Sequence, residues 1–218
     1  MRPPRIPPMA ADIIRNALSS MDGVEFTDLP SCPSCGGTVM GYDMREKQFA
    51  VLEDEGTMRT IHVRVKRFRC RQCGRLCYAG EPFYPDTRIG SPVIDLCVTL
   101  SSTMPASRAA RVLGAMGVIV DRTSCLLYAR SHKGEIPTAN VFGMRLPFSV
   151  LSLSGLAART VEGSRIIGAE ALAACGFPSA PRAAADVPVP AEERDDRDEQ
   201  EEEEKRKTKV PHQGRDSH

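Results

Sequence analysis

Residues 61–74 have the sequence Ile61-His-Val-Arg-Val-Lys-Arg-Phe-Arg-Cys-Arg-Gln-Cys-Gly74. From Ile61 to Val65, apolar residues alternate with polar or basic ones, which indicates a β-strand with one buried face. The apolar positions shift by one before Phe68, and this shift predicts a β-bulge near Arg67. The strand runs directly into a C-x-x-C-Gly motif, so we expect it to present cysteine thiols at its end.

A second motif of the same kind, Cys32-Pro-Ser-Cys35-Gly, precedes the first, and 34 residues separate Cys35 from Cys70. Tetrahedral zinc takes four thiolates at about 2.3 Å, and one C-x-x-C loop can present two of them. The glycine after each second cysteine permits a positive φ, which lets backbone amides point back at the sulfurs. The spacing therefore predicts a zinc ribbon over residues 30–84, with Zn²⁺ as cofactor and as ligands Cys32, Cys35, Cys70 and Cys73.

Other uses of these cysteines fit less well. A disulfide framework is unusual in an intracellular chain, and a thioredoxin-like motif needs a βαβ pattern that is missing here. An iron–sulfur cluster with the same four ligands stays open. Cys77 is interpreted as an apolar strand residue, with a substitute ligand as the alternative. The single cysteines in apolar helical contexts, which are interpreted as core residues, are Cys97, Cys125 and Cys175.

The segment between the two motifs is predicted to be β-structure. Residues 38–44 and 47–52 are expected as two strands around a short turn, and residues 53–56 as a second turn before the basic strand. No acidic residue occurs from 56 to 80. A basic strand beside a small metal-bound core suits contact with phosphate, and the alternative is a solvated face without a partner. The expected phosphate contacts are Arg64, Lys66, Arg67, Arg69 and Arg71.

Residues 85–133 are predicted to form a helix-turn-helix of three short helices. Ser91 with Pro92 marks the start of the first helix. Met104–Gly114 is the second, and Asp121 caps the third, Arg122–Arg130. In this motif the last helix reads bases through its N-terminal residues. We therefore expect base contacts from Arg122, Thr123 and Ser124, and phosphate contacts from Arg108, Arg111, Arg130 and Lys133.

The order of these two parts resembles the N-terminal region of zinc-ribbon insertion-sequence transposases. The resemblance covers roughly residues 30–132. It rests on three stretches: Cys32-Pro-Ser-Cys35-Gly, Arg67-Phe-Arg-Cys-Arg-Gln-Cys-Gly-Arg75, and Ala109-Ala-Arg-Val-Leu-Gly-Ala-Met-Gly-Val-Ile-Val-Asp-Arg-Thr-Ser124. It implies a ribbon and a helix-turn-helix that recognise the inverted repeats at the ends of a mobile element. In that family a DDE catalytic domain of RNase H-like fold follows and uses two magnesium ions.

The chain departs from the family after Lys133. Only about 50 residues precede the charged tail, and their three acids are Glu135, Glu162 and Glu170. A catalytic domain of about 100 residues or more does not fit there, and two-metal catalysis cannot be assembled. Four thiolates also fill the coordination shell of the zinc and leave no position for a catalytic water, which argues against a zinc hydrolase. We expect a protein without enzymatic activity, either a truncated transposase or a regulator derived from one.

The distribution of charge supports a nucleic-acid partner. Residues 59–182 have 17 basic and 7 acidic side chains, whereas residues 1–58 and 183–218 are net acidic. A polyanion responds to such a local field rather than to the overall charge of +1. Double-stranded DNA is the expected partner. The alternative is a zinc-ribbon adaptor that contacts a protein such as a polymerase, although a protein interface needs less charge than this strand has.

The remaining segments complete an α+β chain with five parts. Residues 1–29 contain an amphipathic helix (10–21) that docks either on the domain or on a second copy in a homodimer. Residues 134–182 are expected as a short extension with helices at 148–158 and 166–174. Residues 183–218 have too few apolar residues to offset their ordering entropy, so we expect a disordered acidic tail. No apolar run approaches roughly 18 residues and the start lacks a signal peptide, which predicts a cytoplasmic location without membrane contact, and association with the nucleoid if the protein is prokaryotic.

Overall fold

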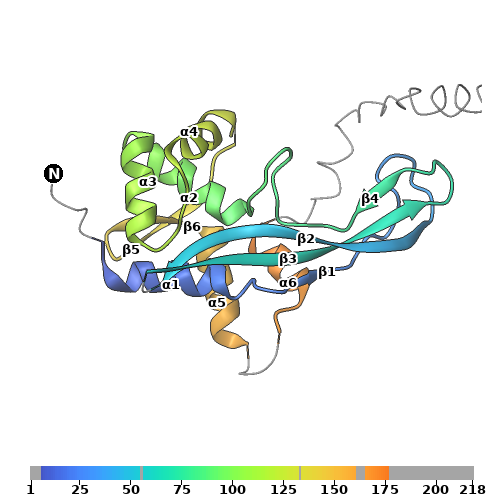
Figure 1. The fold of residues 1–218 in the computed structure, drawn as a ribbon, viewed down its shortest axis with the longest axis horizontal. Coiled ribbons are helices and arrows are strands. Elements are labelled where there is room, and N and C mark those ends of the chain that lie inside the picture. Colours follow the sequence, from blue (N-terminus) through green and yellow to red (C-terminus); the bar gives the residue numbers. More distant parts are fainter. Residues whose placement is uncertain (1–5, 55, 133, 161–164, 177–218) are drawn as a thin grey trace, which may run out of the picture. The chain divides into compact units, whose positions relative to one another are not determined.

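The computed structural model describes residues 6–54, 56–132, 134–160 and 165–176 (Figure 1). These residues form six helices and six strands, so the α+β class expected from the sequence is confirmed. The tail predicted to be disordered, residues 183–218, lies outside the described residues. Among the described helices, none combines the length and the apolar character that a membrane crossing requires.

Two long antiparallel strands, β2 (Val39–Asp54) and β3 (Thr57–Cys70), dominate the larger sheet. Two short strands pair with β3 alone: β1 (Glu25–Phe26) in parallel and β4 (Leu76–Tyr78) in antiparallel orientation. β3 is therefore the strand on which the rest of this sheet is assembled.

The turn predicted between residues 44 and 47 is wrong. Arg45 and Glu46 continue β2 and pair with Val65 and Arg64 of β3. Their polarity suggests a turn in the sequence, but an uninterrupted partner strand supplies the hydrogen bonds of their backbone. The hairpin is consequently longer than the sequence predicts, and it reverses only after Asp54.

Tyr42 and Phe49 are extra residues of β2 that have no partner in β3. Tyr42 lies beside Arg67, so the irregularity predicted near Arg67 is found, although the extra residue belongs to the neighbouring strand. Phe49 and the next residue, Ala50, are both buried, because a bulge turns two consecutive side chains toward the same side. The ring of Phe49 packs edge-on against Phe83, with 6.1 Å between the ring centres.

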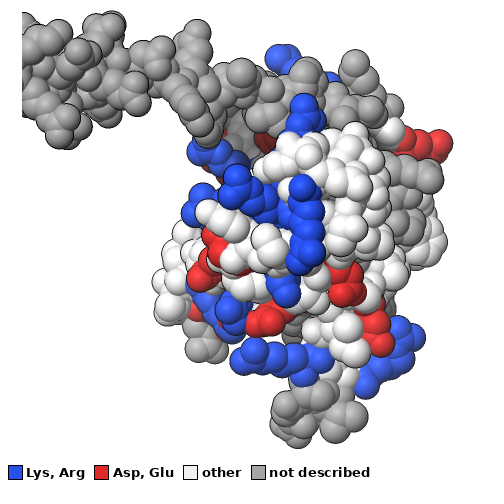
Figure 2. Space-filling view, turned by 90° about the vertical axis from the view of Figure 1, so that its right-hand side faces the viewer, with Lys and Arg blue, Asp and Glu red and all other residues white. Residues whose placement is uncertain are grey.

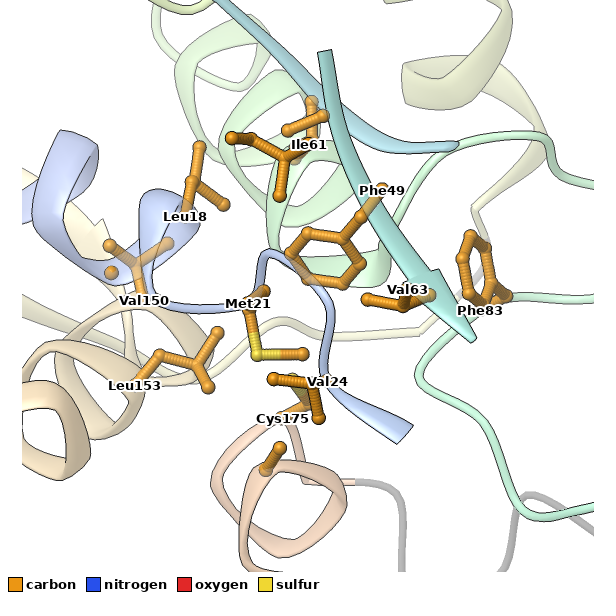
Figure 3. Packing of buried hydrophobic residues seen from close by; sticks show 14 of the residues in the cluster. Leu18, Met21, Val24, Phe49, Ile61, Val63, Phe83, Val150, Leu153 and Cys175 are labelled. Atoms are coloured by element: carbon orange, nitrogen blue, oxygen red, sulfur yellow. The ribbon is translucent and has the colours of Figure 1, made fainter. Parts of the chain in front are cut away.

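The hydrophobic core is one contiguous cluster whose members extend from Ala11 to Cys175. All six described helices contribute residues to it, among them α1 (Pro8–Ser19), α5 (Phe148–Arg159) and α6 (Gly168–Ala174). Figure 3 shows Leu18 of α1 and the following Met21 between Ile61 of β3 and the side chains of α5. The amphipathic N-terminal helix thus docks within its own chain.

Three further helices pack against one another: α2 (Ser91–Ser101), α3 (Ala106–Ala115) and α4 (Arg122–Ser131). The cap predicted for α4 is confirmed, because the Asp121 carboxylate accepts hydrogen bonds from the N–H groups of Thr123 and Ser124. The cap predicted for α2 is one residue off. Gly90 is the N-cap, and Ser91 is fully buried inside the first turn, where its hydroxyl does not cap the helix.

An antiparallel hairpin of β5 (Thr138–Val141) and β6 (Met144–Pro147) follows α4. Its two turn residues, Phe142 and Gly143, have φ values of 51° and 76°. Two consecutive positive φ values are typical of the tight turns that suit the twist of paired strands. The extension predicted for residues 134–182 does not include this hairpin.

Figure 1 shows how these parts are arranged along the long hairpin. The helices α2, α3 and α4 lie beside the end at which β2 turns into β3, whereas β4 and the cysteine loops lie at the other end. A strand rises about 3.3 Å per residue, so the length of β3 separates these two regions by roughly 40 Å.

Candidate metal centre

The first cysteine loop is shaped by its backbone. The N–H of Gly36 donates to the carbonyl of Cys32 at 2.8 Å, and the N–H of Cys32 donates to the carbonyl of Gly37 at 2.9 Å. Gly36 has a φ of 70°, the left-handed conformation expected after the second cysteine. The loop therefore turns both of its thiols to the same side.

The second cysteine loop has nearly the same geometry. The N–H of Gly74 donates to the carbonyl of Cys70 at 3.1 Å, and Gly74 has a φ of 72°. The N–H groups of Gln72 and Cys73 point at the sulfur of Cys70, at 3.4 and 3.5 Å. Such donors stabilise a thiolate, and the pKa of Cys70 is lowered mainly by the N–H of Cys73.

The two loops bring four thiols together. The sulfurs of Cys32, Cys35, Cys70 and Cys73 all lie within 4.8 Å of one another. The Cys32–Cys73 and Cys35–Cys70 pairs are 3.7 and 3.5 Å apart. A tetrahedron of sulfurs at about 2.3 Å from one ion has edges of about 3.8 Å. The predicted cluster is confirmed, and its donor set and spacing fit a tetrahedral metal ion.

Burial differs within the cluster. Cys32 and Cys70 are buried, and Cys35 and Cys73 are exposed. Burial disfavours the thiolate of Cys32, but hydrogen bonds from the N–H groups of Ser34 and Cys35 and from the neighbouring thiols together lower the pKa of Cys32 to about 6. The first cysteine of each loop is therefore shielded, and the second is open to solvent.

Cys77 lies next to this cluster. Its sulfur is 3.7 Å from that of Cys32, and the residue is buried in β4 between Leu76 and Tyr78. Burial and the neighbouring Cys32 raise the pKa of Cys77 to about 12, so it keeps its proton at neutral pH. It does not belong to the group of four sulfurs that are mutually close. The other single cysteines are buried in the core, as expected: Cys97, Cys125 and Cys175.

The basic strand has internal ion pairs that the sequence did not indicate. Arg64 pairs with Glu25 of β1, and Arg67 binds the Asp43 carboxylate through two of its nitrogens. The Arg67 side chain is only 15% exposed. The positive charges of these two arginines are therefore balanced within the chain, which leaves them less available to a phosphate than the sequence suggests.

The other predicted contacts, Lys66 and Arg69 on β3 and Arg71 just after it, are half-buried or exposed. The Lys66 ammonium lies 5.5 Å from the centre of the Phe68 ring, Arg71 contacts the sulfur of Met40 at 3.9 Å, and Arg69 is exposed. Figure 2 shows the side of the structure that lies at the right in Figure 1, where Lys and Arg side chains gather beside uncharged surface.

The predicted contacts on the helices form a separate group. Arg108 and Arg111 are exposed on α3, and Arg122, Thr123 and Arg130 are exposed on α4. Ser124 is half-buried, and its hydroxyl donates to Asp121 at 2.5 Å, so it serves the helix cap. The structure thus places the predicted residues in two groups at opposite ends of the hairpin. Lys133 lies outside the described residues.

Comparisons of the chain with protein-family models, curated proteins and solved structures give no match.

Proposed function

We propose that this chain is a zinc-dependent DNA-binding protein without catalytic activity, built like the DNA-binding region of zinc-ribbon transposases. The observation on which the proposal chiefly rests is the position of α4. This helix packs against α2 and α3, and its first residues, Arg122 and Thr123, are exposed. An exposed N-terminal turn on the last of three packed helices is what a recognition helix needs in order to enter the major groove.

The hairpin β5–β6 adds to this argument. It follows α4 directly, and Phe142 in its turn is 48% exposed. Three helices followed by a β-hairpin is the order found in winged helix-turn-helix domains, in which the hairpin contacts DNA beside the recognition helix. Arg145 on β6 is exposed and donates to Thr138 of the facing strand, so a cation is held on this hairpin.

Zinc is the metal that suits the cysteine cluster best in this proposal. Four thiolates with sulfur spacings of 3.5 and 3.7 Å match a closed structural zinc site. Such a site holds the ends of β2 and β3 together and leaves no position for a catalytic water. The role assigned to zinc is therefore structural, and it would fix the arginines of β3 relative to the helices.

The separation of the two basic groups defines a binding mode. Roughly 40 Å along β3 corresponds to about one turn of duplex DNA, which advances about 34 Å. We propose that α4 and the hairpin β5–β6 contact bases. Arg69 near the C-terminal end of β3 and Arg71 just after it would then contact phosphates one turn away.

The proposal is tested with the zinc-loaded protein and a library of duplexes with a random central segment. The wild type should enrich a motif and should bind it more weakly as salt rises from about 50 to about 200 mM. Arg122→Ala should lower the affinity for that motif by about 1–3 kcal/mol and relax the preference at one position. Arg108→Ala should weaken binding to all duplex sequences alike. It should also reduce the slope of log affinity against log salt concentration by about 1.

Arg159→Ala is the matched control, because Arg159 is an exposed arginine in the last turn of α5, away from α4. It should leave both the motif and the salt slope unchanged. The absence of salt-sensitive duplex binding by the folded, zinc-loaded protein would contradict the proposal.

A further inference from the structure

The end of the hairpin at the cysteine loops has one covered and one open face. Phe68 and Cys70 of β3 are buried, together with Cys77 of β4, on the side of the cysteine loops. The alternate residues of the same strands point the other way. Cross-strand register places Met40, Arg69 and Leu76 in one row on that opposite face, and Asp43, Arg67 and Tyr78 in the next. We call this surface the ribbon face and define it by Met40, Tyr42, Arg67, Arg69, Leu76 and Tyr78.

The ribbon face exposes large uncharged side chains. Tyr42 is 59% exposed, Tyr78 40%, Met40 47% and Leu76 41%. Single exposed hydrophobic residues are common on soluble proteins, but four of them on β2 and β4, the two strands that pair with this end of β3, form a patch. Aromatic rings in such a patch offer flat surfaces for a partner.

Arg67 holds the two tyrosines in place. Its Nε donates to Oδ1 of Asp43 at 2.6 Å, and a second nitrogen donates to the other carboxylate oxygen. Its guanidinium lies 5.5 Å from the centre of the Tyr42 ring, and it also interacts with the side chain of Tyr78. Because these contacts fix the arginine on three sides, Tyr42 and Tyr78 are presented by a pre-organised support rather than by a mobile loop.

The charge around the ribbon face favours a polyanion. Two acids near this face are both paired: Asp43 with Arg67, and Glu81 with Lys47, whose ammonium lies 5.6 Å from the centre of the Tyr78 ring. Arg45 and Arg69 are exposed, and Arg71 reaches the face through its contact with Met40. The patch is therefore complementary to a chain of phosphates whose other part is flat and apolar.

We propose that the ribbon face binds single-stranded DNA, with bases stacked on Tyr42 and Tyr78 and phosphates held by Arg69 and Arg71. Aromatic rings beside cations are how proteins bind single strands without reading their sequence. Bases in a duplex are stacked on one another and cannot offer their faces to a tyrosine. The stacking residues are distinct from α4, whereas Arg69 and Arg71 are shared with the duplex contacts proposed above, so single-stranded and duplex DNA would compete for these two arginines. Only the choice of DNA over RNA rests on the proposed function.

The experiment titrates the zinc-loaded protein with a fluorescent oligo-dT of about 20 nucleotides. Tyr42→Ala and Tyr78→Ala should each weaken binding by about tenfold, which is the usual effect of losing one stacking ring. Tyr42→Phe should keep the wild-type affinity, because stacking needs the ring and not the hydroxyl. Because the chain has no Trp and 4 Tyr, its intrinsic emission comes from tyrosine, and oligo-dT should quench it in the wild type.

Phe148→Ala is the matched control, since Phe148 is an aromatic residue that is 50% exposed on α5. It should bind oligo-dT as tightly as the wild type. Zinc content and circular dichroism establish that each variant is folded. Equal affinity of the wild type and the double variant Tyr42→Ala/Tyr78→Ala for oligo-dT would overturn the proposal, and so would a lack of binding by the wild type. Duplex binding that depends on Arg122 is scored separately, so the two proposals fail independently.

Discussion

Leu52 of β2 forms an antiparallel backbone bridge with Val118, in the connection between α3 and α4. The N–H of Ile119 donates to the carbonyl of Val51 at 2.9 Å, and the N–H of Glu53 donates to the carbonyl of Gly117 at 2.8 Å. Val118 is fully buried. The connection that precedes the proposed recognition helix is therefore bound to the end of the long hairpin, which holds the helices and the sheet in a defined relation.

The first prediction concerns Gly117 in this connection. Its φ is 81°, and a Cβ there would lie 2.8 Å from the carbonyl oxygen of Glu53. Gly117→Ala should lower the free energy of unfolding by about 1–2 kcal/mol from the left-handed conformation alone, with the close contact adding to this loss. Urea unfolding followed by circular dichroism measures the change.

Gly114→Ala is the control for this variant. Gly114 lies in α3, and a Cβ there would meet no atom within 4 Å. Because alanine is the better helix former, this substitution should raise stability by about 0.5–1 kcal/mol. If Gly117→Ala proved as stable as the wild type, the bridge would not have the role that we assign to it.

Metal removal should affect one end of the molecule more than the other. The cysteine loops have few buried apolar residues, whereas α1 and α5 pack in the main core. A structural zinc site contributes an apparent binding free energy of about 10–16 kcal/mol. Chelation should therefore raise hydrogen exchange in residues 31–38 and 70–78 and leave α1 and α5 protected. Loss of protection throughout the core would instead show that the whole fold needs the metal.

Cys77 is predicted to be a neighbour of the metal and not a ligand. Cys77→Ala should keep one metal ion per chain and lower the metal affinity by at most about tenfold, the lower end of the effect of residues that support ligands. Cys35→Ser should lower the affinity far more, because it removes one of the four thiolates. The measurement is the absorption spectrum of the cobalt-substituted protein. The spectrum of a four-thiolate site should persist in Cys77→Ala. A spectrum with one thiolate fewer would assign Cys77 to the ligand set.

Asp95 should make stability depend on pH. Its carboxylate is buried in α2 and accepts hydrogen bonds from Tyr84 at 2.7 Å and Ser149 at 2.6 Å. Burial raises the pKa of Asp95 above its ordinary value in spite of these two donors. The stabilisation from binding the proton is complete below the unfolded pKa of about 3.9 and is lost as pH rises through the higher folded pKa.

Asp95→Asn removes the carboxyl group that titrates, so the variant should not lose stability as this group gives up its proton. The difference in unfolding free energy between the variant and the wild type should therefore shift in favour of the variant as pH rises from about 4 to about 7. Asp12→Asn is the control, because Asp12 is exposed on α1, and it should change stability by less than about 0.5 kcal/mol. A difference for Asp95→Asn that does not vary with pH would contradict the prediction.

Features that depend on neighbouring residues could be predicted from the sequence. The two cysteine loops follow from C-x-x-C-Gly, the cap of α4 follows from Asp121, and the docking face of α1 follows from the spacing of Ile14, Ala17 and Leu18. In each case the residues that form the structure lie within a few positions of one another, so the pattern itself specifies the geometry. The meeting of the two loops also follows, because four thiols at this spacing suit one tetrahedral ion.

Features that depend on distant residues appear only in the tertiary structure. Glu25 and Arg64 are 39 positions apart, and Asp43 and Arg67 are 24 apart, yet each pair forms an ion pair that removes an expected phosphate contact. The exposure of Tyr42 and Tyr78 likewise follows from strand register and from the bulge in β2. Local pattern cannot indicate which side chains lie opposite each other across a sheet, because strand pairing decides it.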